Sequence, residues 1–150
     1  DLPDDFLIMN GDILTDLDFG LFFEDHVNQK SIFTISSTKR ELKTEYGVLE
    51  INDMNELCGF QEKPSLICNV SMGIYAANRE ILKYIPFDMA FGFDDLMFSL
   101  LAEHRNVKVR DFAGYWLDIG RPDDYMQAIE EFDKQKGRLL HEKKSICLTG

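Results

Sequence analysis

Short apolar runs and stretches with helical periodicity alternate along the chain. Residues 6–9 form a continuous apolar run closed by Asn10 and Gly11, a pattern typical of a strand that is buried on both faces and ends in a turn. Residues 31–37 and 107–112 also have the composition of strands. The run of residues 6–9 places Asp12 just beyond the carboxyl end of a strand.

A β-hairpin is expected in the middle of the chain. Residues 46–51 and 56–61 are short β-type segments, and the residues between them, Asn-Asp-Met-Asn, have the composition of a turn. The stretch before them, residues 39–45, is charged and lacks any period, so it predicts a loop.

Two further segments are predicted to be extended. Residues 70–77 are mostly apolar and contain Gly73, and a glycine inside a strand usually marks a bulge or the close approach of another group. In residues 116–119 the period of two along a strand places Trp116 and Asp118 on the same face.

Four segments predict helices. Residues 19–28 and 93–101 carry apolar side chains at helical spacing, and residues 79–84 predict a shorter helix. The strongest signal starts at Pro122, with acidic residues in the first turn and lysines in the last, and predicts an end at Gly137. The apolar face of this helix is formed by Tyr125, Met126, Ile129 and Phe132.

The order of these elements predicts the fold class. Because strands and helices interleave, we expect an α/β fold with a mixed, mostly parallel sheet flanked by helices and an inserted β-hairpin. We assign residues 1–137 to one domain and residues 138–150 to a tail or the start of a further segment. Ligands of open sheets bind beyond the carboxyl ends of strands, where Asp12 is expected.

The charge of the chain narrows its partners. The 150 residues include 27 acidic and 16 basic ones, and the formal net charge of −11 argues against nucleic acid polymers as partners. An acidic ligand therefore needs a metal ion, a lysine or another locally positive spot. No apolar stretch is long enough for a membrane helix and the chain starts with acidic residues, so we expect a cytoplasmic protein without a membrane partner.

Asp12 and Asp118 are acids at the ends of two predicted strands. Two carboxylates that converge on one point can bind a hard divalent cation such as Mg²⁺, which would bridge phosphate oxygens. Each residue taken alone is better explained otherwise. Asp12 has the place of a turn residue, and Asp118 has the place of a cap for the helix that starts at Pro122.

Other residues also allow a functional and a structural interpretation. Lys63 precedes Pro64, whose ring fixes the backbone, so a rigid turn can aim the ammonium at a phosphate, although an exposed loop explains the same residues. Gly47 lets a sugar ring approach the backbone closely, or simply begins a strand. Trp116, the only tryptophan, either shields a site from water or belongs to the core.

Together these motifs resemble the acceptor-binding half of a sugar-1-phosphate nucleotidyltransferase, a family that includes mannose-1-phosphate guanylyltransferase and glucose-1-phosphate thymidylyltransferase. The resemblance covers residues 5–136 and rests on Asn10-Gly11-Asp12, Tyr46-Gly47-Val48, Glu62-Lys63-Pro64 and Trp116-Leu117-Asp118-Ile119-Gly120. It implies a Rossmann-like fold and an enzyme that joins a hexose 1-phosphate to a nucleoside triphosphate. The products would be an NDP-sugar and pyrophosphate, and the cofactor would be Mg²⁺.

The resemblance also implies a role for each motif residue. Asp12 and Asp118 would be the Mg²⁺ ligands, and Lys63 would bind the phosphate of the sugar phosphate. Glu62 would bind sugar hydroxyls. The remaining substrate-binding positions would be Tyr46, Gly47, Ser71, Gly73 and Trp116. Relatives often have asparagine where this chain has Ser71, so the identity of the hexose stays open.

The glycine-rich nucleotide-binding loop of the family lies ahead of the Gly-Asp strand, and this sequence contains no such loop. We therefore expect the 150-residue chain alone to be inactive, as the acceptor and metal half of a longer enzyme. The alternative is a non-catalytic sugar-phosphate-binding regulatory module of the same fold. A sheet without its first strands would have apolar edges, so homo-oligomers are also expected.

Overall fold

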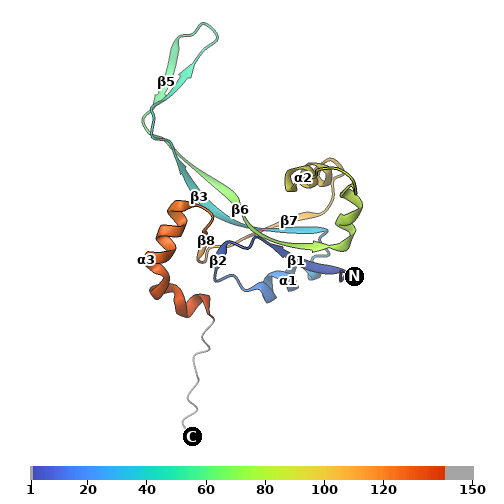
Figure 1. The fold of residues 1–150 in the computed structure, drawn as a ribbon. Coiled ribbons are helices and arrows are strands. Elements are labelled where there is room, and N and C mark those ends of the chain that lie inside the picture. The colour runs from blue at the N-terminus through green and yellow to red at the C-terminus, as the bar shows by residue number, and fades with distance from the viewer. Residues whose placement is uncertain (1, 141–150) are drawn as a thin grey trace.

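A four-stranded sheet with helices on both faces forms the body of the protein (Figure 1). The computed structural model describes residues 2–140. The strands lie in the order β1 (Asp5–Met9), β6 (Ser65–Asn78), β3 (Phe33–Lys43) and β7 (Val107–Asp111). β1 and β3 run antiparallel to β6, whereas β7 runs parallel to β3. The expected α/β class is confirmed, but the sheet is mostly antiparallel, so the prediction of a mostly parallel sheet is wrong.

The directions of the strands follow from their connections. The chain leaves β3, turns back through the hairpin of β4 (Val48–Ile51) and β5 (Leu57–Gln61), and returns as β6 beside β3. Neighbouring strands joined by such a reversal are antiparallel, whereas a parallel pair needs a crossover connection. The parallel pair here is β3 and β7. β6 returns the chain to the end of the sheet where β3 starts, and the 3₁₀ helix η1 (Arg79–Tyr84) and the helix α2 (Phe93–Ala102) then lead to β7.

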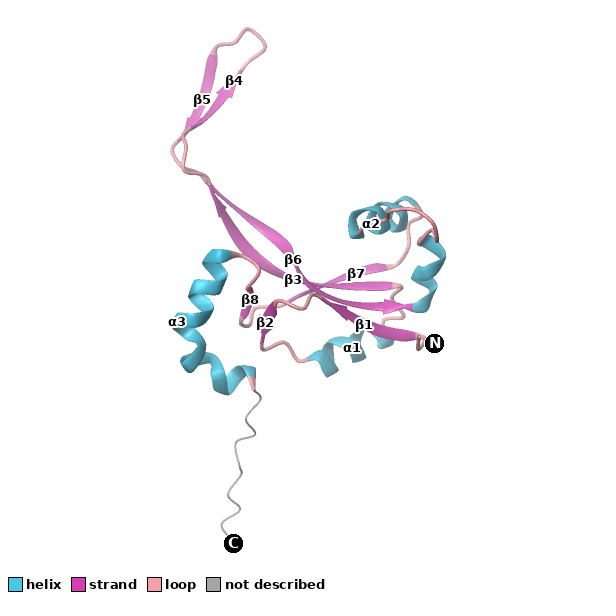
Figure 2. Cartoon of the chain, in the orientation of Figure 1, coloured by secondary structure: helices cyan, strands magenta, loops and turns pink. Residues whose placement is uncertain are grey.

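The pair β3–β6 continues into an arm that projects from the body (Figure 2). Residues 39–43, predicted to lie in a loop, extend β3 because they pair in register with residues 65–69 of β6. The main chain forms such a ladder regardless of side-chain charge, so composition alone gave the wrong prediction. The predicted hairpin is confirmed beyond the arm, where the Asn52 N–H donates to the Glu56 carbonyl at 3.0 Å.

Two apolar clusters hold helices against the two faces of the sheet. One cluster joins the sheet to η1 and α2 and consists of Ile32, Phe33, Ala77, Ile81, Leu96 and Leu100. The other lies under α1 (Phe19–Asn28) and consists of Leu17, Phe22, Met72, Ile74 and Ala76. Neighbouring residues of β6 thus face opposite clusters, as the period of two along a strand requires.

Local signals placed α1 correctly, whereas the burial of β1 differs from the prediction. α1 begins where the Asp18 carboxylate accepts the Leu21 N–H at 2.9 Å, which caps the helix. β1 was expected to be buried on both faces, but Leu7 is 39% exposed and Met9 50%. The reason is that β1 is the edge strand of the sheet and pairs on one side with β6. Pairing of this edge with another copy stays a prediction.

A small second sheet follows β1. β2 (Ile13–Thr15) pairs antiparallel with β8 (Trp116–Asp118), and the helix α3 (Pro122–Leu139) comes next. α3 starts at Pro122 as predicted but continues through Gly137 to Leu139, so the predicted end is wrong. A glycine inside a helix costs only about 1 kcal/mol, which the turns around it can offset. The expected tail lies mostly outside the described residues, and within residues 2–140 no helix could span a membrane.

Gly73 interrupts the ladder between β3 and β6. The register shifts between Ile35 and Ser37, which pair with Tyr75 and Ser71, so β6 bulges at this point. Gly73 has a φ of +75°, and a Cβ on it would lie 2.7 Å from the side-chain nitrogen of Asn10. Both the bulge and the close approach that the sequence indicated are therefore confirmed.

Replacing Gly73 by alanine is expected to destabilise the protein by about 1–3 kcal/mol, because the positive φ is strained for other residues and the Cβ collides with Asn10. Chemical denaturation followed by circular dichroism measures the effect. Gly137→Ala is the matched control: a Cβ there meets no atom within 4 Å, so this substitution should be neutral or stabilise α3 by up to about 1 kcal/mol. Equal effects of the two substitutions would contradict the role of Gly73.

A buried histidine links α1 to the sheet. His26 is 1% exposed, with Nε2 3.3 Å from the Asp5 carboxylate and Nδ1 2.8 Å from the Thr34 hydroxyl. Because a carboxylate only accepts hydrogen bonds, Nε2 donates and the neutral ring accepts through Nδ1. Burial lowers the pKa of His26 below its usual 6.5, and the charge of Asp5 opposes this shift only in part.

The free energy of unfolding is expected to fall as the pH drops below about 6.5. The unfolded chain binds a proton at His26 more readily than the folded protein does. The contribution of the neutral His26 ring to the free energy of unfolding is therefore complete above the pKa of the unfolded chain and is lost as the pH falls below it. Urea denaturation at pH 7.5 and pH 5.5 (about physiological and mildly acidic) tests this for the protein, for His26→Gln and for the control His104→Gln. Only His26→Gln should reduce the difference between the two pH values, and an unchanged difference would refute the assignment.

Candidate functional site

The pairing of β2 with β8 brings the two predicted metal ligands together. Ile13 lies opposite Asp118 in this ladder, and Asp12 directly precedes Ile13 in the chain, so Asp12 lies next to the pair that contains Asp118. The Asp12 carbonyl accepts the N–H of Ile119 at 2.9 Å. Two residues more than one hundred positions apart in the sequence are thus held side by side by main-chain hydrogen bonds.

Gly120 lies between the two carboxylates. A Cβ on this glycine would lie 2.5 Å from Oδ2 of Asp12 and 3.2 Å from Oδ1 of Asp118. Asp118 Oδ1 accepts the Gly120 N–H at 3.2 Å, and the residue at the start of α3 is Arg121, without a side-chain cap. Asp118 therefore shapes a turn and does not cap α3, which removes the simplest structural explanation for it.

The carboxylate pair fits the chemistry of a magnesium site that is shared with a phosphate ligand. Mg²⁺ usually takes one or two carboxylates and completes its coordination with water and phosphate oxygens. Within residues 2–140 no group of three metal-ligating side chains is found, so the protein itself offers Asp12 and Asp118 as a partial site.

A buried carboxylate fixes the backbone of Asp118 by a hydrogen bond. Asp124, in the first turn of α3, is 4% exposed and accepts the backbone N–H of Asp118 at 3.2 Å. Arg40 on β3 donates to both oxygens of Asp124. Burial alone would raise the pKa of Asp124, but these hydrogen bonds and the charges of Arg40 and Arg121 hold it below its usual value. Asp124 therefore stays ionised and ties α3 to β8 and β3.

Trp116 connects this site to the core. Its Nε1–H donates to the Met72 carbonyl at 2.9 Å, while the guanidinium of Arg40 lies 4.9 Å from the centre of the indole ring. This distance permits a cation–π contact. Trp116 and Asp118 both line a hollow of about 170 Å³, which confirms that they share a face. The indole thus packs on the core with one edge and borders the hollow with another.

Several of the predicted ligand-binding residues line this hollow. Its lining consists of Arg40, Leu42, Val70, Ser71, Trp116, Asp118 and Arg121. Ser71 Oγ lies 3.0 Å from the Tyr75 hydroxyl and accepts the N–H of Gly73 at 3.3 Å. Gly73 itself is buried at the bulge.

The predicted residues of the hairpin lie elsewhere. A Cβ on Gly47 would be 2.7 Å from the Phe60 ring and 3.3 Å from Oε2 of Glu62, so these residues sit together where the arm meets the hairpin. Tyr46 is 79% exposed beside them, and Lys63 has a φ of +43°. The structure does not bring this group to the carboxylate pair.

The length of β6 determines how far Lys63 lies from the carboxylate pair. Residues 65–73 span roughly 25 Å of extended chain. Lys63 lies beyond the far end of that span, whereas Gly73 contacts Asn10, close to Asp12.

Sequence reasoning missed three residues of this site. Arg40 lies in the stretch that the sequence predicts to be a loop, Asp124 is only one of the acids in the first turn of a predicted helix, and no motif points to Arg121. A buried acid at the start of a helix has few local signals. The pairing of Asp124 with Arg40 spans 84 positions and depends on tertiary structure.

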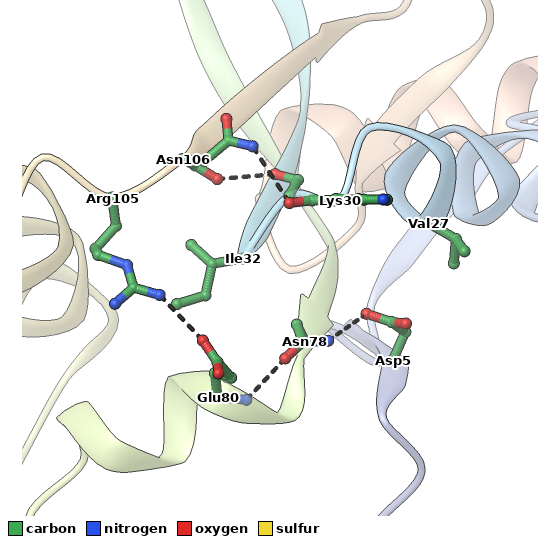
Figure 3. A pocket seen from close by; sticks show the side chains of 9 residues that line it. Asp5, Val27, Lys30, Ile32, Asn78, Glu80, Arg105 and Asn106 are labelled. Carbon is green, nitrogen blue, oxygen red and sulfur yellow. Dashed lines mark hydrogen bonds and ion pairs between the residues drawn. The ribbon is translucent and has the colours of Figure 1, made fainter.

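A larger hollow, of about 510 Å³, lies at the opposite end of the sheet (Figure 3). It borders the start of β1 and the end of β6, near Asp5 and Asn78, whereas Asp12 follows the other end of β1. Four of its polar side chains form two pairs: Asn78 donates to Asp5 at 2.8 Å, and Arg105 pairs with Glu80 at 3.0 Å. This arrangement leaves no cluster of free groups aimed at a ligand, so the candidate site is the carboxylate pair and the hollow beside it.

The fold and the site define an α/β protein with a carboxylate pair suited to a divalent cation. Comparison with known proteins then identifies the family: residues 1–135 match the Nucleotidyl transferase family, and the chain belongs to it. It is 30% identical to the mannose-1-phosphate guanylyltransferase catalytic subunit beta of Drosophila pseudoobscura pseudoobscura, over 83% of this chain and 34% of that protein.

Two bacterial proteins are similar over almost the whole chain. Identity is 31% to a UTP–glucose-1-phosphate uridylyltransferase of Synechocystis sp., over 98% of this chain and 38% of that protein. It is 30% to a glucose-1-phosphate adenylyltransferase of Bacillus subtilis, over 95% and 40%. The chain thus spans little more than a third of the length of these curated relatives.

The fold is also found among solved structures. HddC from Yersinia pseudotuberculosis superposes with a TM-score of 0.59 at 26% identity, over 87% of this chain and 56% of that chain. A structure of the same protein complexed with GMP-PN gives a TM-score of 0.58 over the same shares. The family resemblance stated from the motifs is therefore confirmed.

Gly120→Ala is expected to separate the two carboxylates without unfolding the protein. The new Cβ would collide with the exposed end of the Asp12 side chain, which can swing away. We expect calorimetric titration to show Mg²⁺ binding weakened about tenfold or more, with a melting temperature changed by about 2 °C or less. Gly11→Ala is the control, because a Cβ there meets nothing within 4 Å. Equal Mg²⁺ affinities in the two variants would show that the carboxylates do not share a cation.

Proposed function

We propose that this chain is the acceptor- and metal-binding part of a sugar nucleotidyltransferase. The full protein would join a hexose 1-phosphate to a nucleoside triphosphate and release pyrophosphate. The observation that supports this function best is the convergence of Asp12 and Asp118 on Gly120 in a chain of the Nucleotidyl transferase family. Enzymes for three different bases are among its relatives, so the base and the hexose are not part of the proposal.

The proposed reaction depends on placing two polyanions against each other. A phosphate oxygen of the sugar phosphate forms a bond to the α-phosphorus of the triphosphate, and the bond from that phosphorus to pyrophosphate breaks. The attacking oxygen is already anionic at neutral pH, so no general base is required. Mg²⁺, when bound, would neutralise phosphate charge. Asp12 and Asp118 would hold that ion, and Trp116 would limit access of water beside it.

Lys63 and Glu62 keep their proposed roles toward the phosphate and the sugar hydroxyls. Their place at the end of the arm means that they act on the same ligand as Asp12 only after a change in the position of the arm. Tyr46 and Gly47 would move with them, while Ser71 and Gly73 belong to the body of the sheet.

Calorimetry with hexose 1-phosphates and Mg²⁺ tests the binding half of the proposal. We expect the 150-residue chain to bind glucose 1-phosphate or mannose 1-phosphate in a magnesium-dependent way, and Asp12→Asn or Asp118→Asn to weaken this binding on the order of tenfold. Asp53→Asn, in the exposed turn of the hairpin, is the control and should have no effect.

A pyrophosphate-release assay with the common nucleoside triphosphates tests the catalytic half. Because the sequence contains no glycine-rich phosphate loop, we expect the 150-residue chain alone to bind sugar phosphate without turnover. Turnover by this chain would contradict that expectation. Binding that persists unchanged in Asp12→Asn and Asp118→Asn would contradict the assigned metal ligands and favour a regulatory sugar-phosphate module.

A further inference from the structure

The candidate site carries negative charge where a phosphate is expected to bind, and the residues predicted from the sequence do not neutralise it there. The formal charge of the chain is −11, and the two carboxylates add negative charge where a phosphate should bind. Lys63, the cation predicted for this phosphate, lies beyond the far end of β6. Positive charge close to the carboxylates therefore has to come from other residues of the body.

Arg121 is such a residue. It lies directly between Gly120 and the first residue of α3, is exposed, and lines the same hollow as Asp118. Its charge is close enough to lower the pKa of the Asp124 carboxyl. Among residues 2–140 its guanidinium forms no ion pair, so its donors are available to a ligand.

Arg40 supplies a second cation to the lining of the same hollow. It is fixed by Asp124 and by the Trp116 ring, and its side chain remains 29% exposed. An arginine has more N–H donors than the two hydrogen bonds to Asp124 use. The fixed guanidinium can therefore bind an anion at low entropic cost, since its position is already determined.

The size and lining of the hollow suit a phosphate group. A volume of about 170 Å³ holds a phosphate with a few waters, because a water molecule takes about 30 Å³ in the liquid. Ser71 adds a hydroxyl to the lining, and guanidinium groups match phosphate oxygens in geometry.

We infer that Arg40 and Arg121 form an anion subsite for a phosphate group beside the carboxylate pair. The inference rests on the proposed function for the identity of the ligand, a sugar phosphate or pyrophosphate, but the subsite itself would also bind free phosphate. It assigns the positive charge near Asp118 to two arginines that line the hollow, apart from Lys63 beyond the far end of β6.

The fluorescence of Trp116 provides a direct measurement. It is the only tryptophan, and it lines the hollow in contact with Arg40, so an anion bound there should change its emission. The 150-residue chain is titrated at constant ionic strength with inorganic phosphate, pyrophosphate and glucose 1-phosphate. We expect saturable changes with all three ligands.

Arg121→Gln is the main variant, because within residues 2–140 Arg121 has no ion pair whose loss would affect folding. The half-saturating concentration of inorganic phosphate should rise at least about tenfold, the size expected for one charge-assisted contact. Arg40→Lys keeps the charge beside Asp124 but loses the fork of donors, and should weaken binding in the same direction. Arg105→Gln, at the far end of the sheet, should leave inorganic phosphate binding unchanged.

The outcomes separate this inference from the proposed function. Magnesium-dependent glucose 1-phosphate binding that needs Asp12 but is unaffected by Arg121→Gln would overturn the subsite and leave the function standing. Phosphate binding that needs Arg121, together with no binding of any sugar phosphate, would support the subsite and contradict the function. No fluorescence change with any of the three anions, or equal binding by Arg121→Gln and Arg105→Gln, would overturn the subsite.

Discussion

The buried carboxylate of Asp124 is the interaction on which the site depends. It accepts the Asp118 backbone N–H and two N–H groups of Arg40, so one side chain joins α3, β8 and β3. An isolated buried charge is costly, and these hydrogen bonds compensate for the burial. The same contacts fix the strand that carries Asp118 and hold Arg40 over the Trp116 ring. A structural ion pair thus positions groups that face the candidate ligand.

The sequence predicted what local interactions decide. The helix at 19–28, the hairpin turn at 52–55 and the bulge at Gly73 follow from periodicity, turn composition and the lack of a Cβ. Strand direction and the length of β3 did not follow, because they depend on which strands become neighbours. The charged residues 39–43 are extended only because β6 supplies a partner for each of them.

The candidate site shows the same division. Asp12 and Asp118 could be paired through the resemblance, since each of them lies in a short, continuous sequence motif. Arg40 and Asp124 have no motif, and their contact exists only because β3 passes beneath the first turn of α3. Residues that hold a site together from distant parts of the chain are therefore the ones that sequence patterns miss.

The ladder between β3 and β6 also limits how the arm can act. From Ser37 to Lys43 the strands pair without interruption, so the arm moves as a unit. A bend is easiest at two places: the bulge at Gly73, where the ladder is already broken, and the junction beyond Lys43, where the Thr44 N–H donates to the Pro64 carbonyl. A bend at the bulge would disturb Ser71 and the hollow, whereas a bend at the junction would move Lys63 with the hairpin and leave the arginine subsite intact. The arginines and Lys63 are thus mechanically separable sources of positive charge.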